Sequence, residues 1–185
     1  MSKIALSPNA SGTGVFTIAS PNGNTDRTLT LPDEAGTVLT TAGVPASAMP
    51  AGSVIQVVQY YNPSNNANTT TSTSAVASGV KKTITPIFSN SLIIIQTHIS
   101  MAYSNGWGRA TLYLNGSPMT GAGSYTVGYT DVGHNAYSPY VCNAQYQATS
   151  TSPLEFEIYV AAGSGSYTYT HGNSSSSMTL WEIAQ

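Results

Sequence analysis

The chain has 185 residues, enough for one ordinary domain and an appendage, and only 6% of them are charged, against roughly 25% in an average soluble protein. The formal net charge is −2 and the five basic residues form no cluster beyond the pair Lys81 and Lys82, which excludes the basic stripe that nucleic-acid binding requires. A single cysteine excludes an internal disulfide and a multi-cysteine zinc site, and no segment approaches the ~20 apolar residues of a membrane span.

Residues 1–52 are poor in large apolar side chains and rich in Gly, Pro, Ser and Thr. Short alternating runs, such as Val15–Ile18 and Thr28–Leu31, predict strands between turn residues. So few core candidates cannot bury enough surface for this region to fold alone. We expect it either to be disordered or, as the strand-and-turn pattern favours, to intertwine with other copies of itself. Residues 41–52 are predicted to be a linker.

Residues 53–185 carry the stronger strand signals, because apolar residues recur there at every second position and no window shows a helical stripe. Polar loops rich in Asn, Ser and Gly separate these runs, which is typical of a β-sandwich of the jelly-roll type. We therefore predict an all-β protein, with an extended N-terminal segment and a C-terminal knob. The predicted strands are Ser53–Tyr61, Val80–Thr85, Leu92–Met101, Ala110–Leu114, Leu154–Val160 and Met178–Ile183.

The run Leu92–Ile95 is apolar on both faces, whereas a strand with one wet face is polar at every second position. Both faces of this strand must therefore be covered. Another subunit would provide the second cover, and a loop of the same chain is the alternative. Together with an N-terminal region that cannot form a core, this run predicts a stable homotrimer.

Two passages carry a resemblance to known proteins. Residues 12–41 contain the run Thr28–Asp33 (TLTLPD) and the following Gly36–Leu39 (GTVL). This passage resembles a segment of tail-fibre and other virion surface proteins of tailed phages, especially phages of marine and cyanobacterial hosts. The order of motifs after residue 70, ending in Leu180–Ile183 (LWEI), is similar to the C-terminal domains of such fibres. Those domains are similar to trimeric jelly rolls of the tumour-necrosis-factor and complement-C1q type.

The resemblance implies a non-enzymatic, homotrimeric protein of the phage particle surface, made in the host cytoplasm. Residues 1–52 would contact other virion proteins, and the knob would contact the host cell surface, so the first expectation is a short tail fibre or receptor-binding protein. Members of this group usually carry a long shaft between the two ends, and this chain has none. A capsid decoration protein that staples capsomers through its N-terminal segment is therefore the alternative.

The sequence offers no assembled catalytic or metal site. Glu155 and Glu157 share one face of a predicted strand at the ~7 Å spacing of alternate residues, as a glycosidase pair would, but solvated acids on a wet face are the expected interpretation. The histidines His98, His134 and His171 are scattered. We predict no catalytic residue, metal or cofactor, although one His from each chain could meet on a three-fold axis. Cys142 is expected to be a small buried or half-buried apolar residue.

Aromatic residues gather in the middle of the second region among Asn, Ser and Gly. Tyr and Trp offer a flat contact area with one polar tip, which suits recognition surfaces, and sugars stack on such rings. The predicted surface for a host glycan is centred on residues 121–138, while the alternative is that most of these rings fill the sandwich and the trimer interface. The candidate residues are Trp107, Tyr125, Tyr129, Asp131, His134, Asn135, Tyr137 and Tyr140.

Overall fold

The computed structural model describes residues 10–15, 17–19, 22–26, 28, 30, 44–63, 67–104, 108–119, 126–127, 137–169 and 175–185. The chain divides into two compact units, Met1–Val38 and Leu39–Gln185. The whole of the predicted linker, residues 41–52, therefore lies in the same unit as the sandwich. Within it, a short 3-10 turn at Ala46–Ala48 (η1) leads into the first strand.

The described residues of the first unit lie in neither a helix nor a strand, and all of them are exposed in the single chain. Val15 and Ile18 are 91% and 76% exposed. Apolar side chains with no cover in their own chain agree with the expectation that this region cannot form a core by itself.

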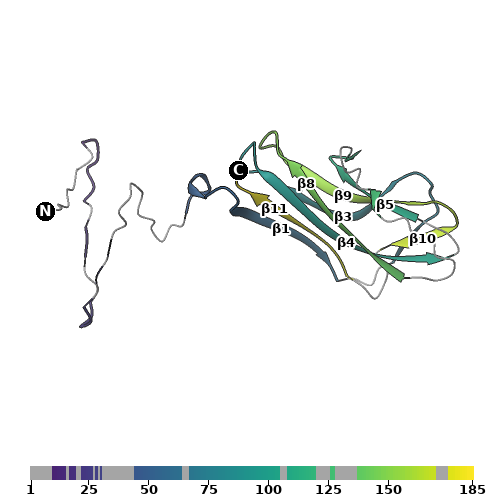
Figure 1. The fold of residues 1–185 in the computed structure, drawn as a ribbon, viewed down its shortest axis with the longest axis horizontal. Coiled ribbons are helices and arrows are strands. Elements are labelled where there is room, and N and C mark those ends of the chain that lie inside the picture. Colours follow the sequence, from purple (N-terminus) through teal and green to yellow (C-terminus); the bar gives the residue numbers. More distant parts are fainter. Residues whose placement is uncertain are drawn as a thin grey trace. The chain divides into compact units, whose positions relative to one another are not determined.

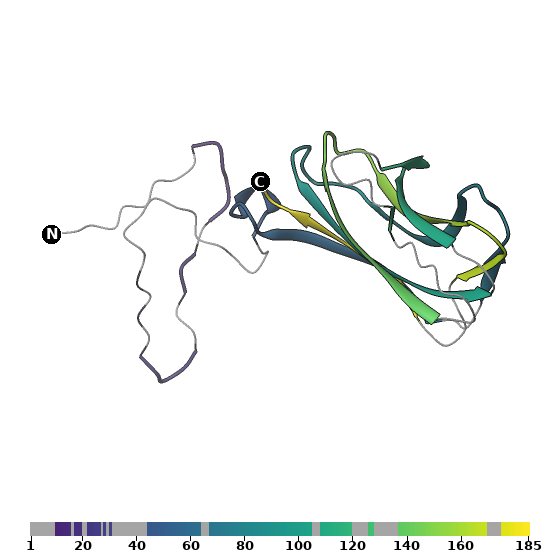
Figure 2. The same cartoon turned by 45° about the vertical axis from the view of Figure 1, so that its right-hand side comes forward.

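The second unit is an all-β sandwich of two antiparallel sheets, as predicted (Figures 1 and 2). We name them sheet A and sheet B. In sheet A the order is β1-β11-β4-β10-β2, with β8 on the other edge of β4. Its strands are β1 (Val54–Asn62), β2 (Asn68–Thr70), β4 (Leu92–Ser104), β8 (Tyr137–Gln147), β10 (Ser166–Tyr169) and β11 (Ser176–Ile183).

Sheet B has the order β3-β9-β5-β6, with β7 also pairing β5. From β3 to β5 and again from β8 to β10, successive strands alternate between the two sheets, which is typical of a jelly roll. The strands of sheet B are β3 (Val76–Ile84), β5 (Gly108–Leu114), β6 (Ser117–Pro118), β7 (Thr126–Val127) and β9 (Leu154–Ala162).

Strand β4 organises sheet A because it is 13 residues long and has different partners along one edge. Its first half pairs β11, from Leu92 opposite Ile183 to His98 opposite Ser177. Its last four residues pair β10, and its other edge pairs β8 over Leu92–Ala102. A single strand therefore connects the middle of the sheet to both ends of the sandwich.

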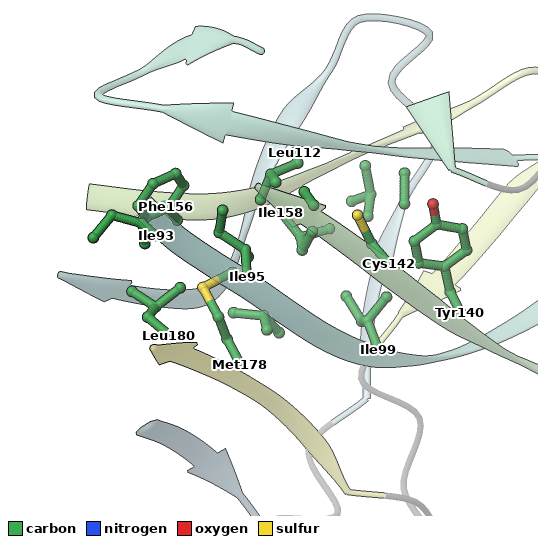
Figure 3. Close-up of a cluster of buried hydrophobic side chains, with 14 of the residues drawn as sticks. Ile93, Ile95, Ile99, Leu112, Tyr140, Cys142, Phe156, Ile158, Met178 and Leu180 are labelled. Carbon is green, nitrogen blue, oxygen red and sulfur yellow. The ribbon is translucent and has the colours of Figure 1, made fainter. Parts of the chain in front are cut away.

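The core lies between the two sheets and is built from the inward side chains of each strand (Figure 3). Ile93, Ile95 and Ile99 of β4 are fully buried, as are Phe156 and Ile158 of β9. Ile93, Ile95 and Ile99 therefore define the face of β4 that points into the core. Each such side chain contributes ~1.5–3 kcal/mol by leaving water.

Glu182 is a buried acid at the end of the sandwich where β1, β11 and the β3–β4 loop meet. Its Oε1 accepts hydrogen bonds from the backbone N–H groups of Ile87 (2.8 Å) and Phe88 (3.2 Å) and from the Ser91 hydroxyl (2.5 Å). Its Oε2 accepts one from the Gln56 side-chain amide at 2.6 Å. A fully buried carboxyl group is tolerated because these donors replace its water, and it fixes the loop to two strands.

Candidate interaction surfaces

Most of the aromatic site predicted from the sequence lies outside the described residues. This applies to Trp107, Tyr125, Tyr129, Asp131, His134 and Asn135. Tyr137 begins β8, where its backbone pairs Ala102. The glycan-binding hypothesis for this stretch therefore stays a prediction.

Tyr140 is the one predicted recognition residue whose side chain the structure describes, and it is only 5% exposed. The inward positions of β8 are Tyr140, Cys142 and Ala144, so the ring points between the sheets (Figure 3). A ring in this position packs in the core and offers no stacking face to a sugar. Tyr140 therefore follows the alternative interpretation, that these tyrosines fill the sandwich.

The two glutamates of β9 differ in their environments. Glu155 is partly exposed and forms an ion pair with Lys81 of β3 at 3.1 Å, as a solvated surface acid would. That pairing raises the pKa of the Lys81 ammonium group, chiefly through the hydrogen bond to Glu155. Glu157 is only 7% exposed, and its carboxylate accepts the backbone N–H of Gly79 at 3.1 Å. The expectation that both acids are solvated is wrong for Glu157, because the bulge of β3 brings a backbone donor onto it.

Cys142 is buried as predicted, and burial raises the pKa of its thiol to about 11. An apolar environment disfavours the thiolate, which is the reactive form. Within the described part of the chain, no group of three or more His, Cys, Asp or Glu residues could hold a metal ion. In the same part, no helix is long and apolar enough to cross a membrane.

The outer face of sheet A presents three aligned rows of side chains across the strands β1, β11, β4 and β8. The first row is Val57, Trp181, Ile94 and Gln145, the second is Gln59, Thr179, Gln96 and Asn143, and the third is Tyr61, Ser177, His98 and Val141. None of these residues is Asp, Glu, Lys or Arg. Because only 6% of the whole chain is charged, this absence decides little by itself.

The exposed apolar side chains indicate more clearly which face another molecule covers, because they are divided unequally between the two sheets. The five large apolar side chains that are exposed within described strands all lie on sheet A, and none lies on sheet B. Ile94 is 37% exposed in the single chain, so its own chain leaves more than a third of it uncovered. In the first row, Val57 and Ile94 flank the half-buried Trp181, so apolar side chains are neighbours across three strands. A contiguous apolar patch on a surface marks an interaction site. The five are Val54, Val57, Tyr61, Ile94 and Val141.

Sheet B has the opposite character. Its strands carry Lys81, Lys82, Arg109, Glu155 and Glu157, whereas the remaining described charge of the sandwich, Glu182, is buried. Among the described residues, the two broad faces of the sandwich are therefore an uncharged face with exposed Val and Ile and a charged face with exposed polar groups.

Comparison with known proteins does not assign the chain to a family. No protein-family model matches the chain, and no curated protein sequence matches it. Among solved structures, it is similar to a chain of the structure of infectious bursal disease virus, Gx strain, with a TM-score of 0.37 and 17% sequence identity. The match covers 71% of this chain and 33% of the viral chain.

Proposed function

We propose that this protein is a non-enzymatic structural component on the surface of a tailed-phage particle, assembled as a homotrimer. Its role is that of a short tail fibre or receptor-binding protein. Residues 1–52 attach it to other virion proteins, and the sandwich is the knob that contacts the host cell. The support comes from the resemblance of residues 12–41 to tail-fibre and other virion surface proteins and from the all-β sandwich that follows them.

The outer face of sheet A supports assembly into a homotrimer. Val57 and Val141 are 51% and 53% exposed there, at opposite edges of the four-strand face. In a ring of three identical copies, each copy uses two different interaction surfaces, one for each neighbour, because the interface is heterologous. A face that is apolar at both edges meets this requirement.

Capsid decoration is the second candidate, and it is favoured by the short connection between the two regions. Only residues 42–53 separate the tail-fibre-like passage from the first strand, so no shaft extends the knob away from the particle. Both candidates are trimeric and neither requires catalysis.

Purified particles test the proposal and separate the two candidates. Quantitative gel analysis counts the copies per particle, and gold-labelled antibody against the knob locates them. Tens of copies at the tail support the fibre, whereas hundreds over the capsid support decoration. Absence of the protein from washed particles overturns the proposal. Release of reducing ends from host polysaccharide that disappears in Glu155→Gln or Glu157→Gln would contradict the non-enzymatic part.

A further inference from the structure

Two tyrosines form a stacked pair on the outer face of sheet B. Tyr113 of β5 lies opposite Glu157 of β9, and Tyr159 of β9 lies opposite Thr111 of β5, so the two rings are diagonal neighbours. Their centroids are 3.8 Å apart and their planes differ by 16°. Both side chains are half-buried, so part of each remains in water. Rings that hold each other in place lose little further side-chain entropy when a ligand binds.

Charged side chains of both signs surround this pair. Lys81 is opposite Glu157 and forms its ion pair with Glu155, which lies two residues before Glu157 in β9 on the same face. Arg109 lies on the same face of β5 as Tyr113 and is exposed. Each of these charged groups already has a partner in its own chain: Lys81 pairs with Glu155, the buried Glu157 accepts the Gly79 N–H, and Arg109 donates to the Thr73 carbonyl at 3.4 Å.

We propose that this aromatic and charged face of sheet B binds a neutral saccharide. A pyranose ring presents C–H groups that pack on aromatic rings, and its hydroxyls donate to carboxylates and accept from ammonium and guanidinium groups. A charged sugar would have to compete with these existing pairings, because the charges of Lys81 and Glu155 already neutralise each other. A ligand without formal charge displaces none of them, so a neutral sugar fits this face best.

This inference rests on the proposed function, because a trimer that covers sheet A leaves the outer face of sheet B as the broad surface open to a host cell. It differs from the expectation drawn from the sequence, which placed the recognition surface in residues 121–138. The residues proposed to bind the saccharide lie on regular strands, which position a binding site more rigidly than loops do.

A glycan array tests the inference. The fluorescently labelled 185-residue protein is applied to an array of neutral and acidic bacterial glycans, and its binding is measured. We expect binding to neutral glycans, a loss of at least tenfold in Tyr159→Ala, and binding within about twofold of wild type in Tyr159→Phe, which keeps the ring. Thr111→Gln provides a second variant, because it adds bulk beside the rings without removing them, and it should weaken binding while the melting temperature changes little.

Three results would overturn the inference: binding restricted to acidic glycans, no binding to any glycan, or equal binding by wild type, Tyr159→Ala and Thr111→Gln. Competition of the purified protein with phage adsorption is measured in parallel. If the protein blocks adsorption but binds no neutral glycan, the receptor-binding function stands and only this inference fails. If the protein is absent from particles yet binds neutral glycans through Tyr159, the proposed function fails and the site remains.

Discussion

Replacing Glu182 should destabilise the knob more than any other charge-removing change in the described sandwich. The side chain is 0% exposed and accepts four hydrogen bonds. In Glu182→Gln, one oxygen can still accept from Ile87, Phe88 and Ser91, but the new amide group faces the amide of Gln56. Rotating the Gln56 amide does not help, because its nitrogen also donates to the Thr85 carbonyl at 2.7 Å.

The expected cost follows from these contacts. Bonds to a charged acceptor contribute ~1.5–3 kcal/mol and neutral bonds ~0.5–1.5 kcal/mol. Glu182→Gln weakens three bonds and removes one, while the neutral side chain regains part of the desolvation cost of a buried charge. We expect a net loss of roughly 2–3 kcal/mol for Glu182→Gln. Glu182→Ala leaves three donors without a partner and opens a cavity, so its loss should be roughly 4 kcal/mol or more.

Urea unfolding followed by tryptophan fluorescence measures these losses. Wild type and variants are compared at one protein concentration, because the stability of an oligomer depends on concentration. Glu155→Gln is the matched control. It removes an acid whose partner is on the surface, where ion pairs contribute little, so its midpoint should stay near that of wild type. A Glu182→Gln protein within ~0.5 kcal/mol of wild type would refute the account of this cluster.

Two further predictions concern single sites. Cys142 should resist a maleimide reagent at pH 8 in the native protein and react once the protein is unfolded in urea. Burial raises the pKa of its thiol to about 11, so between pH ~9 and 11 only the unfolded chain loses this proton. The free energy of unfolding should therefore fall as the pH rises through this range. Rapid native labelling would contradict its burial. Gly79 has φ +78° and a methyl group at its Cα would meet no other atom, so Gly79→Ala should cost ~1–2 kcal/mol through backbone strain alone. A neutral effect on the urea midpoint would refute that reasoning.

Much of the sandwich could be predicted because its central strands alternate clearly. Leu154–Val160 lies within β9, and Leu92–Met101 within β4. Strand β8 was missed because its inward positions include Tyr140, Cys142 and Ala144, which do not form a strong apolar alternation. Strands β2 and β10 were missed because they are short, polar and paired with each other at one end of the sheet.

The candidate surfaces were less predictable for a physical reason. The apolar run Leu92–Ile95 indicated that the second face of β4 needs a cover, and the exposure of Ile94 agrees with a cover from outside the chain. However, the rows that place Val57, Trp181 and Ile94 side by side depend on the register of three strands distant in sequence. The stacking of Tyr113 on Tyr159 and the hydrogen bond from Gly79 to Glu157 depend on pairing in the same way.

The central claim, that copies of this chain assemble through the outer face of sheet A, is tested most directly by one mass measurement. Light scattering is carried out at micromolar concentration on wild type, on Ile94→Asp and on the control Thr83→Asp, which adds the same charge to an exposed position on sheet B. An unpaired charge buried in an interface costs several kcal/mol, so wild type and Thr83→Asp should have the mass of three chains and Ile94→Asp that of one. A monomeric wild type, or an Ile94→Asp protein as trimeric as wild type, would contradict the account.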